Sequence, residues 1–185
     1  MRRRRVLQCV AALGVAAAVA WSPLAGRTAS AQATDRPILI LISIDTLRAD
    51  HLATYGYTKG RTPNIDALAK DAVVFDRAYA HAPQTLPSHT SMLTGQLPFE
   101  HGVRDNIGFT VKADAVTLPS LFKRAGYGAG GFVSAYVLRP ETGIGRGFDV
   151  YNAELPADAL DRPLAQVQRS GPETVAAAVR WLGTH

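Results

Sequence analysis

The chain has very little cysteine: Cys9 is the only one among its 185 residues. A single thiol excludes an intramolecular disulfide. Cys9 also lies in a segment that we expect to be removed, so the mature chain is expected to offer no thiolate as a nucleophile or metal ligand. The apolar stretch 6–20 is shorter than the ~20 residues that a membrane-spanning helix needs. We therefore expect no stable membrane span in the mature chain.

Beyond the first 33 residues, the chain also has no excess of positive or negative charge. The chain has 20 Lys and Arg against 15 Asp and Glu. Five Arg and no acid lie in residues 1–33, so 15 basic residues remain against the 15 acidic ones. This balance gives no general electrostatic case for binding nucleic acid. Since 47% of the residues are apolar, a globular fold is expected.

Residues 1–33 have the pattern of an export signal. A basic start, Arg2–Arg5, precedes an Ala-rich apolar stretch, and Ala31-Gln32-Ala33 offers small residues for cleavage. The adjacent Arg residues allow a twin-arginine route as well as the Sec route. We expect a signal peptide at 1–33, a mature chain at 34–185, and a periplasmic or secreted location.

The run Ile38–Ile44 predicts a central strand buried on both faces, because it is rich in β-branched residues and lacks polar alternation. Asp45 follows at its carboxyl end, the edge where open α/β sheets bind ligands. An Asp in this place also serves simply as a turn cap. The remaining pattern predicts helices at 62–69, 117–127 and 173–182, a strand at 128–133 and an exposed loop at 156–171. The expected fold class is α/β, with a mostly parallel central sheet sandwiched by helices.

The segment 82–95 predicts a helix that begins beside a hydroxyl group. Pro83 disfavours helix before it, Pro87 is tolerated in the first turn, and Gly95 can end it. Thr85 would then stand at the helix N-terminus, where free N–H groups and the positive dipole end attract an anion. The same Thr could instead be an N-cap only. The residues expected on the buried side are Met92 and Leu93.

This segment resembles the signature of the sulfatases, in which a Cys or Ser precedes x-Pro-Ser-Arg and a run that ends in Leu-Thr-Gly. The chain has Pro87-Ser88 and Leu93-Thr94-Gly95. It departs from the signature with Thr85 for the Cys or Ser and His89 for the Arg. The family converts that Cys or Ser to a formylglycine, and Thr lies outside the residue types converted. The resemblance implies an alkaline-phosphatase-like fold.

The pattern Thr-x-Pro-x-His is also similar to the nucleophile segment of nucleotide pyrophosphatase/phosphodiesterases, in which the Thr hydroxyl attacks phosphorus. Residues 45–50 resemble the first metal-binding segment of sulfatases, many of which begin it with two consecutive Asp. This chain has Asp45 and then Thr46, and the phosphodiesterases also carry a single Asp at this place. These resemblances imply Thr85 as the catalytic nucleophile. They also imply a divalent metal, calcium or zinc, with Asp45 and Thr85 among its ligands.

Two further residues are candidates for substrate binding. In the phosphodiesterases an Asn after a similar His-Gly-Val segment donates to the phosphoryl oxygen, which implies this role for Asn106. Asn106 equally suits a turn before Gly108. His89, one helical turn after Thr85, lies on the same face and could orient the substrate where the family has Arg. A packed helix histidine is the other interpretation.

Together these residues predict an exported, metal-dependent, sulfatase-like hydrolase of sulfuric or phosphoric esters, acting on a small-molecule or glycan ester. The alternatives are a phosphodiesterase- or phosphonate-type hydrolase with a Thr nucleophile, and a non-catalytic sulfatase-like fragment. We expect 34–185 to be the N-terminal part of the catalytic domain, with further metal ligands beyond His185. Apolar surface is then expected where the rest of the sheet would pack. The oligomeric state stays open.

Cleavage after the small residues near Ala33 is the first testable prediction. Mass spectrometry of the N-terminus of the exported protein should find a chain that begins close to Thr34. A cytoplasmic product that still begins at Met1 or Arg2 would show that the leader prediction is wrong.

Overall fold

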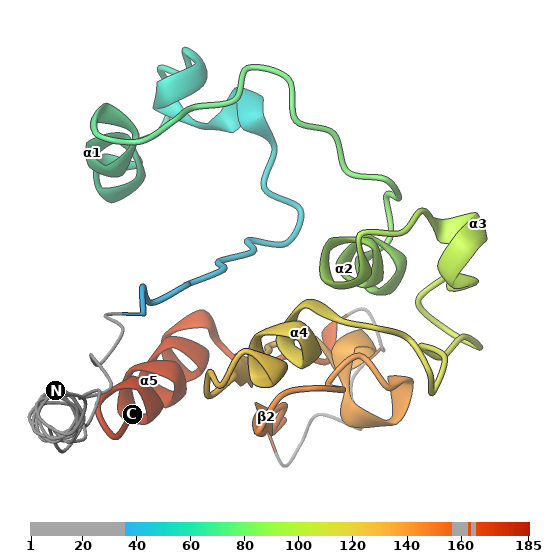
Figure 1. The fold of residues 1–185 in the computed structure, drawn as a ribbon. Helices are drawn as coiled ribbons and strands as arrows, with labels where there is room; N and C mark the ends of the chain where they lie inside the picture. The colour runs from blue at the N-terminus through green and yellow to red at the C-terminus, as the bar shows by residue number, and fades with distance from the viewer. Residues whose placement is uncertain (1–35, 157–162, 164–165) are drawn as a thin grey trace, which may run out of the picture. The chain divides into compact units, whose positions relative to one another are not determined.

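The computed structural model describes residues 36–156, 163 and 166–185 (Figure 1). The predicted signal peptide at 1–33 lies outside the described residues and stays a prediction. The chain divides into two compact units, with the boundary between Ser43 and Ile44.

The described part of the first unit, residues 36–43, is extended and forms no strand. Its apolar side chains lie in solvent, with Ile38 80% exposed and Ile42 76% exposed. The prediction of a buried central strand at Ile38–Ile44 is therefore wrong for this structure. Apolar residues make a strand only where a neighbouring strand accepts their backbone hydrogen bonds, and none of the described residues pairs with this run.

The second unit contains a parallel pair of strands, β1 (Gly130–Phe132) and β2 (Val150–Asn152). Gly130 lies opposite Val150 and Phe132 opposite Asn152. Helix α5 (Gly171–Leu182) packs against β1, where the indole of Trp181 lies 6.0 Å from the ring of Phe132. Parallel pairing with helical cover confirms the α/β class, and β1 confirms the strand predicted at 128–133.

Four more helices accompany α5: α1 (Pro63–Lys70), α2 (Thr85–Thr94), α3 (Pro98–His101) and α4 (Leu118–Arg124). The 3₁₀ turns with bounds inside the described residues are η1 (Ala49–His51), η2 (Ala53–Tyr55), η3 (Tyr136–Leu138) and η4 (Pro140–Thr142). The helices predicted at 62–69, 117–127 and 173–182 are confirmed. Local chemistry explains where they start. The side chains of Thr117 and Ser170 cap α4 and α5 by accepting N–H groups of the first turn, and α1 begins with Pro63 at its first position.

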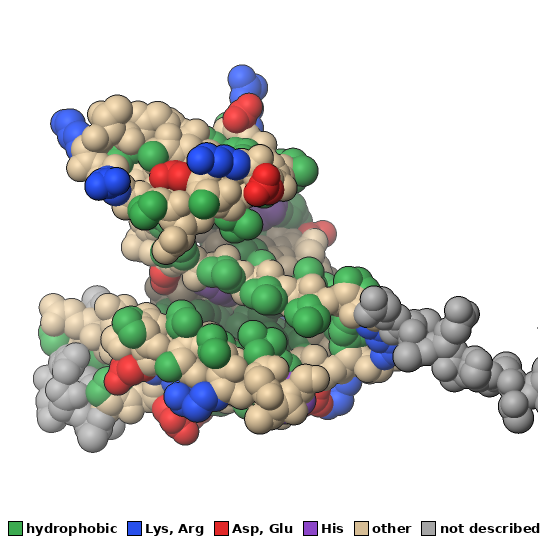
Figure 2. Space-filling model, turned by 90° about the vertical axis from the view of Figure 1, so that its left-hand side faces the viewer, with side chains coloured by type: hydrophobic (Ala, Val, Ile, Leu, Met, Phe, Trp, Pro, Cys, Tyr) green, Lys and Arg blue, Asp and Glu red, His purple; other side chains and the backbone are tan. Residues whose placement is uncertain are grey.

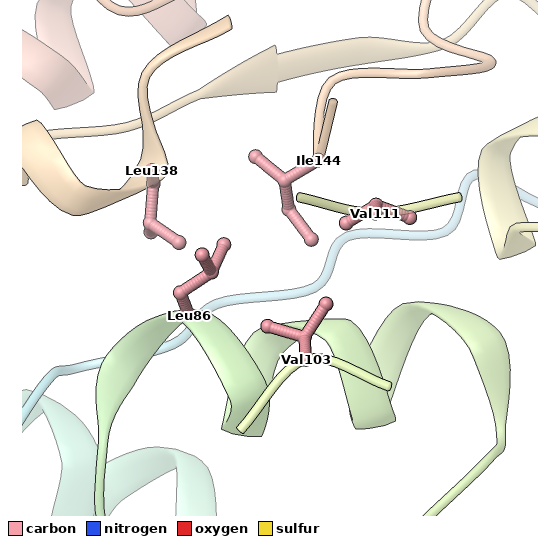
Figure 3. Packing of buried hydrophobic residues seen from close by; sticks show 5 residues of the cluster. All are labelled: Leu86, Val103, Val111, Leu138 and Ile144. Carbon is pink, nitrogen blue, oxygen red and sulfur yellow. The ribbon is translucent and has the colours of Figure 1, made fainter. Parts of the chain in front are cut away.

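The core of the second unit gathers one apolar side chain from each of several segments (Figure 3). Leu86 points from α2 toward Leu138 and Ile144, and both Leu86 and Val103 are fully buried. The buried side of α2 therefore starts at Leu86 and continues through Thr90. The prediction that Met92 would be buried is wrong, because it is 43% exposed, whereas Leu93 is partly buried against the core.

Residues 166–170 correct the prediction of an exposed loop at 156–171. Val167 and Arg169 are buried. Arg169 donates from Nη2 to the carbonyl oxygens of Val133 and Asn152, which lie at the carboxyl ends of β1 and β2. A guanidinium supplies five donors in a rigid fork, so it satisfies several strand-end carbonyls at once.

Apolar side chains are also numerous at the surface (green in Figure 2). On α5, Val175 and Val179 are each 60% exposed, although they form the apolar stripe that the sequence predicts. The expected exposure of apolar surface is therefore present. None of the helices in the described part of the chain is long and apolar enough to cross a membrane.

The close approach of Gly147 to α4 generates the second prediction. Gly147 has a φ of 90°, and an added Cβ would lie 2.6 Å from the backbone nitrogen of Ser120. Gly147→Ala should lower the free energy of unfolding by about 2–5 kcal/mol, because a left-handed backbone and a clash with backbone are combined. Urea unfolding monitored by circular dichroism measures the change.

Gly171→Ala is the matched control, since an added Cβ there meets nothing within 4 Å. It should leave the free energy of unfolding unchanged or raise it by up to about 1 kcal/mol. Equal effects of the two substitutions would contradict the packing seen at Gly147.

Candidate active site

Thr85 is the first residue of α2, and the residues around it explain why the helix begins there. Gln84, the N-cap residue, is extended with φ −92° and ψ 151°, and its side chain makes no capping hydrogen bond. Pro87 occupies the third helical position and Gly95 ends the helix with a φ of 69°. The placement of Thr85 at a helix N-terminus is confirmed, and the alternative that Thr85 is the N-cap is wrong.

The hydroxyl of Thr85 is instead bonded to a residue 40 positions earlier. Thr85 Oγ1 donates to Asp45 Oδ2 over 3.0 Å. Asp45 is exposed and Thr85 is half-buried, so the pair is open to solvent on the carboxylate side. The structure thus brings together the two residues predicted as metal ligands.

The backbone beside Asp45 is strained. Thr46 has a φ of 57°, and it is the only residue other than Gly with a positive φ in the described ranges. Left-handed backbone is unfavourable for a β-branched residue and concentrates at functional sites. Backbone strain directly after Asp45 supports the choice of Asp45 as a candidate functional residue.

The free donors at the start of α2 are few. The N–H of Leu86 donates to Asn106 Oδ1 over 2.8 Å, Pro87 has no N–H, and Ser88 donates to Gln84 O. Of the first-turn N–H groups, only that of Thr85 has no hydrogen bond within the described chain. An anion at this N-terminus would therefore meet one backbone donor.

Asn106 reaches this helix end from the loop after α3. Because a backbone N–H can only donate, the atom bonded to Leu86 is the side-chain oxygen, and the amide orientation is fixed. Asn106 therefore caps α2 rather than forming a turn through its side chain. Its NH₂ group makes no hydrogen bond to another described residue, so both donors remain for a ligand.

His89 is tied to the backbone of its own helix. Its Nδ1 lies 2.8 Å from the carbonyl oxygen of Thr85, and a carbonyl only accepts, so Nδ1 carries the proton. Nε2 is then the ring nitrogen left for a substrate. This contact agrees with a histidine packed on its own helix, and the role of His89 in orienting the substrate stays a prediction. His81, by contrast, lies exposed in a loop.

The donors present fit a divalent cation by type and fall short in number. Asp45 and Thr85 supply oxygens, the atoms that hard cations prefer. A calcium site takes six to eight oxygens and a zinc site about four ligands. The described residues contain no group of three or more His, Cys, Asp or Glu side chains that could hold a metal ion.

One buried pair near α2 was missed by sequence reasoning. The ring of His101 is 3% exposed, its Nε2 lies 3.0 Å from Ser91 Oγ, and its Nδ1 accepts the N–H of Val103 over 3.1 Å. Burial lowers the pKa of His101; the nearby Glu100 carboxylate opposes this shift and Lys112 adds to it. No local pattern marks a Ser ten residues before a His as its partner, because the contact is made by tertiary packing.

A cavity of about 510 Å³ lies at the other end of α2, between that end and α4. Met92, Gly95 and Leu121 are among its lining residues, and Thr85 is not. The candidate chemistry therefore does not lie in this cavity but on the exposed edge formed by Asp45, Thr85 and Asn106.

Residues 37–172 match the family model described as Sulfatase. The chain belongs to the sulfatase family. This confirms the resemblance drawn from the Thr85–Gly95 segment at the level of the family. The assignment of Thr85 as nucleophile stays a prediction.

Several sulfatases are similar to about half of this chain. A Delta 4,5-hexuronate-2-O-sulfatase of Bacteroides thetaiotaomicron is 34% identical over 105 residues, covering 55% of this chain and 22% of that protein. The iduronate 2-sulfatase of Homo sapiens is 37% identical over 106 residues, covering 56% of this chain and 19% of that protein. A solved structure of a 2-O GAG sulfatase is 30% identical, with a TM-score of 0.49, and covers 57% of this chain and 23% of that chain. The chain thus spans about a fifth of the length of these relatives.

The third prediction concerns metal binding by the 185-residue chain. Two oxygen donors give weak affinity, so titration calorimetry with calcium and with zinc should show no submicromolar site. Tight binding at one site that is lost in Asp45→Asn would show that further ligands lie within this chain.

Proposed function

We propose that the protein is an exported, metal-dependent hydrolase of sulfuric or phosphoric esters in which Thr85 is the nucleophile. The observation that carries this proposal is the hydrogen bond from Thr85 Oγ1 to Asp45 Oδ2 at the first residue of α2. A nucleophile bonded to a proton acceptor is the arrangement that hydroxyl-based catalysis requires. Membership of the sulfatase family supports the same reaction class.

In this reaction Thr85 Oγ1 attacks the sulfur or phosphorus atom of the ester, and the bond to the leaving alcohol breaks. The Thr85 proton passes to the Asp45 carboxylate, and the departing alkoxide takes a proton from solvent. A bound divalent cation at Asp45 would supply Lewis-acid activation of the hydroxyl. Thr lacks the second hydroxyl through which a hydrated formylglycine releases sulfate, so water must release the group. Water attacks the sulfur or phosphorus atom, the bond to Thr85 Oγ1 breaks, and Oγ1 takes back its proton from Asp45.

Two donors would face the charge that develops on the transferred group. These are the N–H of Thr85, at the positive end of the α2 dipole, and the NH₂ of Asn106, whose orientation is set by Leu86. His89 Nε2 also points to no described partner, but with the proton on Nδ1 it donates to an anion only when the ring is doubly protonated. The Arg of the sulfatase signature is thus replaced by two neutral donors, the N–H of Thr85 and the NH₂ of Asn106.

We propose a sulfated glycan or a related small ester as the substrate. The similar sulfatases include enzymes named for hexuronate, N-acetylglucosamine and N-acetylgalactosamine sulfates. The predicted signal at 1–33 would deliver the enzyme to the periplasm or outside the cell, where such glycans occur.

A phosphodiester is the second candidate substrate. It is favoured by one specific feature, the Thr in place of the Cys or Ser that becomes formylglycine. Neither a phosphate nor a sulfate ester on Thr has a geminal hydroxyl to expel it, so an activated water must hydrolyse either one. A Thr nucleophile followed by hydrolysis is what the resemblance to the phosphodiesterases implies for phosphate.

Replacement of the nucleophile is the fourth prediction. In the full-length protein, Thr85→Ala should lower kcat by about 10³-fold or more, since the covalent step is lost, while the fold is retained. Aryl sulfate and aryl phosphodiester hydrolysis are both measured, because the faster substrate identifies the transferred group. Mass spectrometry of acid-quenched enzyme should locate the covalent group on the peptide that contains Thr85.

Two controls distinguish loss of the nucleophilic hydroxyl from a change in the stability of α2. Thr85→Ser keeps a hydroxyl and should keep measurable turnover, and Thr94→Ala removes a hydroxyl from the last residue of the same helix without loss of rate. If Thr85→Ala retains most of the wild-type rate on both substrates, Thr85 is not the nucleophile.

A further inference from the structure

His101 is a buried polar residue that the proposed mechanism does not use. It ends α3, and both of its ring nitrogens are bonded, one to Ser91 of α2 and one to the backbone of Val103. Because the Val103 N–H can only donate, Nδ1 must hold a lone pair. The neutral ring therefore carries its proton on Nε2 and donates it to Ser91 Oγ.

The segment that begins at His101 leads directly to Asn106. Gly102 turns the chain with a φ of 83°, and Val103 then enters the core beside Leu86 (Figure 3). Three residues later Asn106 Oδ1 accepts the N–H of that same Leu86. The 101–106 segment therefore contacts α2 at three points: His101 bonds Ser91, Val103 packs beside Leu86, and Asn106 accepts the N–H of Leu86.

We infer that His101 is a positioning residue that holds Asn106 against the start of α2 and thereby orients the Asn106 NH₂ group toward the transferred group. This inference rests on the proposed function only for its catalytic consequence. The structural part concerns Leu86 and can be tested without any substrate.

Protonation of His101 would break its hydrogen bond with the Val103 N–H. A doubly protonated imidazole has no lone pair, so Nδ1 would oppose the Val103 N–H instead of accepting it. The charged groups around the ring are Glu100 on its own helix, and Lys112 and Asp114 from the segment that packs against α3. Burial lowers the pKa of His101. Its contribution to stability is therefore present above the ordinary histidine value of about 6.5 and is lost as the pH falls through the lowered value.

Hydrogen exchange of the Leu86 amide in the full-length protein tests this inference, because that amide reports the bond to Asn106. Its protection factor, corrected for the intrinsic pH dependence of exchange, is measured at about pH 7.5 and at the lowest pH at which the protein stays folded. In the wild-type protein we expect it to fall by about tenfold at the lower pH, as one hydrogen bond is lost.

Three variants sharpen the test. His101→Asn places an oxygen near the position of Nδ1 that accepts the Val103 N–H without titrating, so protection of Leu86 should no longer depend on pH. His101→Gln keeps a group for Ser91 and loses Nδ1, so protection should be about tenfold lower at both pH values. His51→Asn is the matched control: His51 is exposed and stacks on Tyr57, and the variant should behave as wild type.

The catalytic consequence is a split between kinetic constants. His101→Gln should lower kcat by about tenfold with little change in KM, because Asn106 acts on charge that develops only in the transition state.

A wild-type Leu86 protection factor independent of pH, or a pH dependence that persists in His101→Asn, would overturn the inference. If neither ester is hydrolysed, the proposed function fails, and the Leu86 measurement still decides the role of His101. Should the variants not fold, the wild-type pH series and the ring ¹⁵N shifts of His101 give the same decision.

Discussion

The anchoring of Leu86 is the constraint on which the site depends. Its side chain is fully buried in the core, and its backbone N–H is capped by Asn106 from the loop after α3. Leu86 follows Thr85 directly, so fixing Leu86 fixes where the hydroxyl emerges. A buried side chain of this size contributes about 1.5–3 kcal/mol, and a buried amide left without its acceptor would cost about 1–3 kcal/mol. Both terms act on the same residue.

The two halves of the candidate site are held unequally. Thr85 and Asn106 belong to the packed region around Leu86. Asp45 follows an exposed apolar run and contacts that region through an exposed hydrogen bond, which contributes about 0.5–1.5 kcal/mol. The strained backbone at Thr46 adds a local cost. A cation shared by Asp45 and Thr85 would strengthen this weaker half.

In the proposed active site, the departures from the sulfatase signature change the electrostatics as well as the proposed nucleophile. An Arg is always charged and offers a fork of donors to an anion. His89 offers one ring nitrogen, because the other is bonded to the carbonyl of Thr85. Under the proposed function, the anion would therefore depend more on the helix N-terminus and on Asn106. That dependence gives a physical reason for the ties that hold Asn106 in place.

Local chemistry was readable from the sequence alone. The prolines, glycines and capping residues predicted α1, α2, α4 and α5 because they act within one helical turn, and they placed Thr85 at a helix start. The Thr85–Gly95 segment also indicated the family.

Nearly every contact between residues far apart in the sequence was decided by the tertiary structure. Ile38–Ile44 reads as a buried strand, yet burial requires neighbours that only packing supplies. The Asp45–Thr85 contact was expected from the family resemblance, whereas its hydrogen bond, the capping of Leu86 by Asn106 and the burial of His101 against Ser91 join residues 10 to 40 positions apart. No periodicity or propensity encodes such pairs, because each forms only when the packing of distant segments brings its two residues together.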